Sequence, residues 1–199
     1  MFENMIHRVI GHLKIRDKHT HEMLVDKQNA IHFGNISWAV SKALAGDDEG
    51  HITHMVFGSG GTSIDSSGNI IYRSPNTSNL QDPTAQPYQP TYWKSFDAGN
   101  ASIGVVAGTS NFSDLKTNVS LGFGEPVDQD AQDQAVVTND TYVFDEIALY
   151  TSDGGTLGAH PVFEPGPGRM LTHIIFHPVQ KANNRELEIE YTIRVQMGP

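Results

Sequence analysis

The stretch 186–197 constrains the fold more than any other part of the sequence. Polar and apolar side chains alternate strictly along it, in the order Glu-Leu-Glu-Ile-Glu-Tyr-Thr-Ile-Arg-Val-Gln-Met. Successive side chains of a β-strand point to opposite faces, so this period of two predicts a strand with one buried face and one face in water. Such a strand needs a sheet around it and a core beneath it.

Further strands are expected along the rest of the chain. Apolar patterns bounded by turn residues predict strands over 8–16, 51–57, 102–107, 119–123, 142–150 and 171–179. Residues 7–26 are expected to form one β-hairpin, and 171–179 to pair with the C-terminal strand across a turn at 180–184. The 19 Gly and 10 Pro supply many turns. The predicted fold is all-β, an antiparallel β-sandwich or jelly-roll-like domain.

One segment, residues 36–45, predicts a short helix. Asn35 can accept a hydrogen bond as its N-cap, and Gly46 follows as a stop signal. The apolar positions expected on one face are Ile36, Val40, Ala43 and Leu44. A helix this short is stable only against a sheet.

The 199 residues are expected to form a single β-rich domain. Within it, residues 63–99 are predicted to be a long irregular loop or arm. The part 63–90 is dominated by Ser, Asn, Thr, Asp, Gln and Pro, and only Ile70, Ile71 and Tyr72 resemble a strand. A loop of this length is uncommon inside a compact domain, which favours either an extended arm or a surface that a partner orders.

Charge and composition exclude several classes of function. The net charge is −10 and Lys and Arg do not cluster, which disfavours direct binding to nucleic acid or an anionic membrane. The chain has no cysteine, so disulfides, Cys-ligated zinc and Cys nucleophiles are ruled out. No apolar run approaches the length of a membrane span, and the N-terminus carries charges throughout. We therefore expect a soluble protein assembled in the cytoplasm.

The histidines do not predict a metal site. The tightest pairs are His19 with His21, His51 with His54, and His173 with His177. On a strand, His173 and His177 would share a face but lie about 13 Å apart, too far to share one ion. Asp128, Asp130 and Asp133 superficially follow a calcium loop, but the required Gly and Glu are missing.

No catalytic constellation is evident either. Asp145 and Glu146 are adjacent on an expected strand and would face opposite sides unless the strand bulges there. The segment 58–62 (GSGGT) lacks the ending of a phosphate-binding loop, and no Gly-x-Ser-x-Gly elbow occurs. No catalytic, cofactor-binding or metal-binding residue is assigned, and the chain is predicted not to be an enzyme.

Three stretches carry a resemblance to a known class of proteins. They are 19–61, with HTHEMLVDKQNAIHFGNISWAV and HMVFGSGGTS; 144–155, FDEIALYTSDGG; and 171–195, LTHIIFHPVQKANNRELEIEYTIRV. Together they resemble virion structural proteins of tailed bacteriophages, particularly of phages that infect cyanobacteria and other aquatic bacteria. The second stretch also resembles strands of tail-fibre and collar-associated domains. The resemblance supplies no functional residues.

The resemblance implies a non-enzymatic component of the virion, at the neck, tail or baseplate, or a head decoration. Its partners would be other virion proteins and copies of itself, as a homo-oligomer. One alternative is a carbohydrate-binding module for host surface glycans, in which Tyr88, Tyr92 and Trp93 would stack on sugar rings. Another is a small hydrolase that uses Asp or His.

Overall fold

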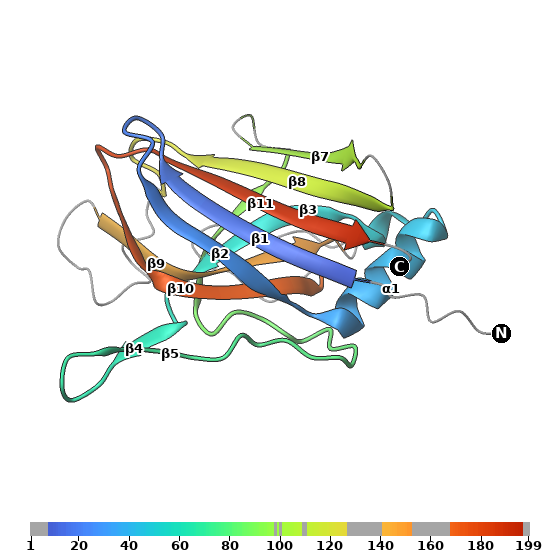
Figure 1. Ribbon diagram of the computed structural model, residues 1–199, viewed down its shortest axis with the longest axis horizontal. Coiled ribbons are helices and arrows are strands. Elements are labelled where there is room, and N and C mark those ends of the chain that lie inside the picture. The colour runs from blue at the N-terminus through green and yellow to red at the C-terminus, as the bar shows by residue number, and fades with distance from the viewer. Residues whose placement is uncertain are drawn as a thin grey trace.

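The computed structural model describes residues 8–97, 99, 101–108, 111–126, 141–152 and 168–196. Strands dominate it, as expected (Figure 1). The elements in chain order are β1 (Arg8–Asp17), β2 (Met23–Ile31), α1 (Phe33–Leu44), the short 3-10 helix η1 (Asp48–Gly50), β3 (Ile52–Gly58), β4 (Thr62–Ile64), β5 (Ile70–Tyr72), β6 (Pro90–Ser95), β7 (Ala101–Ala107), β8 (Phe112–Leu121), β9 (Thr141–Thr151), β10 (Met170–Ala182) and β11 (Leu187–Gln196).

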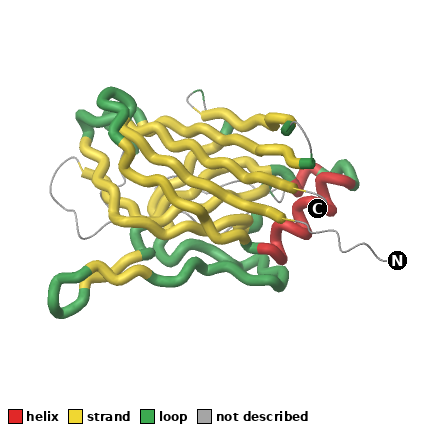
Figure 2. The backbone as a smooth tube through the Cα atoms, viewed as in Figure 1, coloured by secondary structure: helices red, strands yellow, loops and turns green. Residues whose placement is uncertain are grey.

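Nine of these strands form one antiparallel sheet in the order β6-β3-β9-β10-β2-β1-β11-β8-β7. Strand β2 pairs with β1 along its first part and with β10 only at Ala30 and Ile31. The sheet therefore folds over at β2 into two facing layers, one built on β1, β11 and β8 and the other on β3, β9 and β10 (Figure 2). The predicted all-β, sandwich-like fold is confirmed.

The main core lies between the two layers. Its largest fully buried side chains include Leu13, Phe57, Phe144, Phe176 and Tyr191. Helix α1 lies at one end of the sandwich (Figure 1), where Ala39 is buried in this core and Ile36 and Trp38 pack against it. A smaller apolar cluster, which includes Val56, Ala148 and Tyr150, covers the outer side of the β3–β9 layer.

The alternation of the C-terminal strand is confirmed, but its expected partner is wrong. Leu187, Ile189, Tyr191 and Ile193 are at most 3% exposed, while the residues between them reach solvent. However, β11 pairs with β1 and β8, whereas β10 pairs with β9 and β2. Residues 170–176 of β10 are all buried, so both of its faces are covered. The turn after β10 therefore carries the chain from one layer to the other and closes no hairpin.

The helix begins earlier than predicted and buries a different face. Its N-cap is His32, whose Nδ1 accepts from the Asn35 amide at 3.3 Å, so Asn35 lies inside the first turn. Val40 is 42% exposed and Leu44 is 84% exposed, while Gly34, Asn35 and Ala39 are buried. The stop at Gly46 is confirmed by its positive φ of 74°.

Two stretches expected to be irregular contain regular strands. Strand β8 already begins at Phe112, seven residues before the strand predicted over 119–123. The segment 63–99 holds the β4–β5 hairpin, and its residues 90–95 form β6, which pairs with β3 at the sheet edge. Among its described residues, the long irregular part is 73–89. Asp128, Asp130 and Asp133 lie outside the described residues.

Candidate functional site

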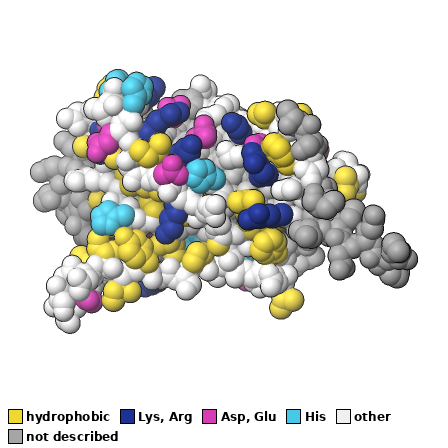
Figure 3. All heavy atoms as spheres, viewed as in Figure 1, with side chains coloured by type: hydrophobic (Ala, Val, Ile, Leu, Met, Phe, Trp, Pro, Cys, Tyr) yellow, Lys and Arg dark blue, Asp and Glu magenta, His cyan; other side chains and the backbone are white. Residues whose placement is uncertain are grey.

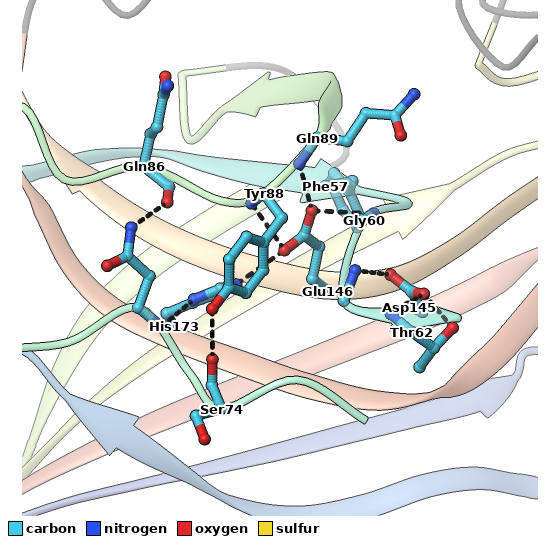
Figure 4. A network of polar contacts seen from close by, with 12 residues as sticks. Phe57, Gly60, Thr62, Ser74, Gln86, Tyr88, Gln89, Asp145, Glu146 and His173 are labelled. Atoms are coloured by element: carbon cyan, nitrogen blue, oxygen red, sulfur yellow. Dashed lines mark hydrogen bonds and ion pairs between the residues drawn. The ribbon is translucent and has the colours of Figure 1, made fainter. Parts of the chain in front are cut away.

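A buried polar network lies where the arm meets the layer formed by β9 and β10 (Figure 4). Its centre consists of Asp145 and Glu146 from β9 and His173 from β10, and each side chain is at most 3% exposed. Removing a charged group from water costs free energy unless hydrogen bonds within the protein replace its bonds to water. The hydrogen-bond partners of each group therefore decide what the site can do.

Glu146 accepts four hydrogen bonds. Its Oε1 accepts from the amides of Gly60 at 3.1 Å and Gln89 at 2.8 Å, and its Oε2 from the amide of Tyr88 at 3.0 Å and from His173 Nε2 at 2.9 Å. Burial opposes ionisation of the carboxyl, but the hydrogen bonds from His173 and the amides outweigh it. The pKa of Glu146 therefore lies below its ordinary value.

The hydrogen bonds of His173 define its tautomer. The backbone amide of Asn76 donates to Nδ1 at 2.8 Å, so Nδ1 carries no proton. The proton then lies on Nε2, which donates it to Glu146. Both nitrogens of this neutral imidazole are occupied by the protein, so the pair has no free group to act as a general base.

Asp145 binds the same loop through different amides. It accepts from the backbone of Gly61 at 2.8 Å and of Thr62 at 2.7 Å, and from the Thr62 hydroxyl. Burial raises the pKa of Asp145 above its ordinary value, even though these bonds act in the opposite direction. The two neighbouring carboxyls thus have pKa values shifted in opposite directions.

Both carboxyls can reach one loop because the strand pairing is irregular at this point. Glu146 is opposite Ile175, but Phe144 is opposite Val179, so β10 contributes extra residues between these two pairs. The exception left open from the sequence was a bulge in the strand of Asp145 and Glu146 itself, whereas the extra residues lie on its neighbour β10. The only sequence signal for the site was the presence of Asp, Glu and His inside strongly apolar strands.

The remainder of the arm is fastened by further hydrogen bonds. The Asn35 side-chain amide donates to the carbonyls of Asp82 at 2.8 Å and Met170 at 2.9 Å, and its oxygen accepts from the Asp82 amide. The Tyr150 hydroxyl donates to the Ala85 carbonyl, and the Tyr88 hydroxyl to the Ser74 carbonyl. Helix α1 and strands β9 and β10 therefore hold segment 73–89 against the sandwich.

The β4–β5 hairpin projects from this anchored base (Figure 1). Its apolar side chains face water: Ile64 is 75% exposed, Ile71 50% and Tyr72 48%. At the tip, the Asp65 carboxylate accepts from the amides of Ser67 and Asn69 at 2.8 Å each, which stabilises the turn. The hairpin is thus an ordered projection with exposed apolar side chains on both of its faces, Ile64 and Tyr72 on one and Ile71 on the other.

The predicted histidine pairs lie in separate environments. His19 pairs with Glu186 at 2.8 Å, while His177 is exposed and bonds to the Tyr72 hydroxyl. His54 is 1% exposed and stacks on Tyr150, with ring centroids 5.3 Å apart. In the described part of the chain, no three His, Asp or Glu side chains are grouped to hold a metal ion. Nor does any described helix have the length and apolar character needed to cross a membrane.

The three aromatic residues considered for glycan stacking do not share a surface. Tyr92 is 7% exposed and packs on Phe57 in the core, while its neighbour Trp93 points to the other face of β6, against His54. Tyr88 is 42% exposed, but the Arg73 guanidinium covers its ring at 4.7 Å from the centroid. No specific observation therefore favours a sugar-binding platform.

The outer face of the β1–β11–β8 layer carries charges of both signs (Figure 3). Arg16 donates to Glu188 at 2.9 Å, and Arg194 forms two hydrogen bonds with Asp114. Lys18 and His19 pair with Glu186. Glu186 and Glu188 are therefore paired with basic groups of the same chain. A shallow cavity of about 360 Å³ lies on this face between Ile10, His12, Gln28, Asp114, Lys116, Thr192 and Arg194.

Comparisons with protein-family models, with curated proteins and with solved structures each found no match. The function is therefore argued from the geometry of the chain.

Proposed function

We propose that this chain is a non-enzymatic structural subunit of a tailed-phage virion, in which it contacts other virion proteins and copies of itself. The observation that carries the proposal is the projecting β4–β5 hairpin. Ile64, Ile71 and Tyr72 are roughly half exposed or more on it. Apolar side chains on an ordered projection mark a surface that another protein covers.

The buried network supports this proposal because it anchors the segments on either side of the hairpin to strand β9. Asp145 and Glu146 bind backbone amides on both sides of the hairpin, at Gly60, Gly61 and Thr62 before it and at Tyr88 and Gln89 after it. A rigid base lowers the entropy lost when the hairpin meets a partner. The network thereby connects the core of the sandwich to a contact surface.

The test is a double substitution on the hairpin, Ile64→Ser with Ile71→Ser. Both side chains are exposed, so the melting temperature of the free subunit should change little. Incorporation into assembled particles should fall by roughly tenfold or more, because two apolar contacts are lost. Incorporation is measured by quantifying the subunit in purified particles.

The matched control is Leu80→Ser. Leu80 is 77% exposed but lies outside the hairpin, so its replacement should leave incorporation unchanged. Normal incorporation of the double variant would contradict the proposal.

A further inference from the structure

Strand β7 forms one edge of the nine-stranded sheet and pairs, among the described elements, only with β8. Its sequence, Ala-Ser-Ile-Gly-Val-Val-Ala, has no charge and no proline. Ile103 is 39% exposed, Val105 72% and Val106 50%. Natural edge strands are usually protected by charges, proline or bulges, because an open edge can pair with another strand. The opposite edge, β6, begins at Pro90 and contains Lys94, so it has these features.

Among the described residues, nothing pairs with the backbone donors and acceptors along the outer edge of β7. The Gly108 amide donates to the Phe112 carbonyl at 3.0 Å, so Gly108 faces β8. Antiparallel pairing alternates along a strand, and the residues whose backbone groups then face β8 are Ser102, Gly104 and Val106. The residues whose N–H and C=O groups face the open edge are Ala101, Ile103, Val105 and Ala107.

We propose that β7 pairs antiparallel with β7 of a second copy of this chain, with Gly104 on the two-fold axis. In this register Ile103 lies opposite Val105 of the second copy, and Ala101 opposite Ala107. All four residues that face the open edge then pair with one another. The two Gly104 residues meet at a non-hydrogen-bonded position, where opposing Cα atoms approach to about 4.5 Å.

Residue type favours a second copy as the occupant, and the absence of charge on β7 permits it. Only this register places the two Gly104 residues opposite each other, at a pair where the Cα atoms approach most closely. Within the single chain, a Cβ built on Gly104 has nothing within 4 Å. Each copy carries a net charge of −10, so most of their surfaces repel each other. The uncharged β7 edge avoids this repulsion, and association should therefore strengthen as salt screens the remaining charges.

The register can be tested directly because the chain contains no cysteine. In the variant Gly104→Cys, the two cysteines meet on the two-fold axis within disulfide distance, so mild oxidation should convert most of the protein to a covalent dimer. In the control Ser102→Cys, the two cysteines are separated by about four residues along the strands, or about 13 Å, and should not link. Equal linking of both variants, or none at Gly104→Cys, would overturn the register.

A second pair of variants tests the pairing without cysteine. Val105→Pro removes an N–H that faces the open edge and makes no bond to β8, so the single chain should keep its fold. Sedimentation velocity should show dimerisation weakened by about tenfold or more, since each dimer loses two hydrogen bonds. Val105→Ala keeps the N–H and should have a much smaller effect.

The result also separates this inference from the proposed function, which rests on the hairpin. A wild-type chain that stays monomeric at every concentration and salt would overturn the inference. So would a Val105→Pro variant that fails to enter particles while Gly104→Cys forms no disulfide, because the edge would then bind a different subunit. Neither outcome bears on the Ile64 and Ile71 variant.

Discussion

At the scale of single residues, Glu146 holds the arm to the sandwich. Three backbone amides and one imidazole donate to its carboxylate, and the carboxylate itself is fully buried. The side-chain amide of a Gln in the same position would direct its NH₂ group at one of these donors. The carboxylate, and not merely a side chain of this size, is therefore required.

We expect Glu146→Gln to lower the free energy of unfolding by roughly 2 to 4 kcal/mol, because buried donors lose their acceptor. Segment 73–89 should also become sensitive to protease, since Tyr88 and Gln89 lose their anchor. Chemical denaturation and limited proteolysis measure the two effects. Glu22→Gln is the control: this side chain is 67% exposed and should have little effect on either. Wild-type stability of Glu146→Gln would show that the arm is held by other contacts.

His54 connects stability to pH. Its Nε2 is buried and has no hydrogen-bond partner among the described residues, and burial lowers the pKa of His54 from 6.5 to about 4. Between these two pH values the unfolded chain therefore binds a proton at His54, whereas the folded chain does not. Stability is complete above about pH 6.5 and falls as the pH drops towards 4, by roughly 3 kcal/mol for this group.

His54→Phe should flatten this pH dependence, since a phenyl ring fills the stack on Tyr150 and does not titrate. The measurement is the melting temperature of both proteins between pH 7 and pH 4. The control is Ser63→Ala, at an exposed position without a titratable group, which should retain the wild-type slope. An unchanged slope in His54→Phe would assign the loss of stability to other groups.

At the scale of elements, β11 is a core strand. Its exposed face carries two ion pairs with neighbouring strands, Glu188 with Arg16 and Arg194 with Asp114. Ile189 is 0% exposed, so Ile189→Ala should leave a cavity and cost roughly 2 to 5 kcal/mol. Glu188 is about one-third exposed and pairs with Arg16, so Glu188→Ala should cost at most about 1 kcal/mol. Urea denaturation of both variants is the check. The reverse order of the two effects would mean that the register is wrong.

Helix α1 shows why an apolar pattern can mislead in a short element. The pattern pointed to Val40 and Leu44, yet these face water and the polar Asn35 is buried. Asn35 is the better anchor because its amide satisfies carbonyl and N–H groups on the arm and on β10 at once. A partner that distant in sequence gives no local signal.

At the scale of the whole molecule, the two layers are joined through β2, and hydrogen bonds of β6 connect them a second time. Lys94 of β6, 5% exposed, bonds to the Ser120 carbonyl at the end of β8 and to Glu125 at 2.5 Å. The edge strand of one layer is thereby linked to the other layer. Strand β7 lies beyond β8 at the end of the sheet, and its outer edge is left open among the described elements.

The sequence by itself determined the class of fold, most strand positions and the buried face of β11, because alternation and turn residues act locally along the chain. The tertiary structure decided which strands are neighbours. Strands β10 and β11 follow each other in sequence but lie in different layers, since β10 is covered on both faces and β11 on one. It also decided the site: Glu146 and His173 become a fastener only when Gly60, Asn76 and Gln89 are brought to them. Pairing across such separations depends on packing and on the satisfaction of buried polar groups, which no local pattern records.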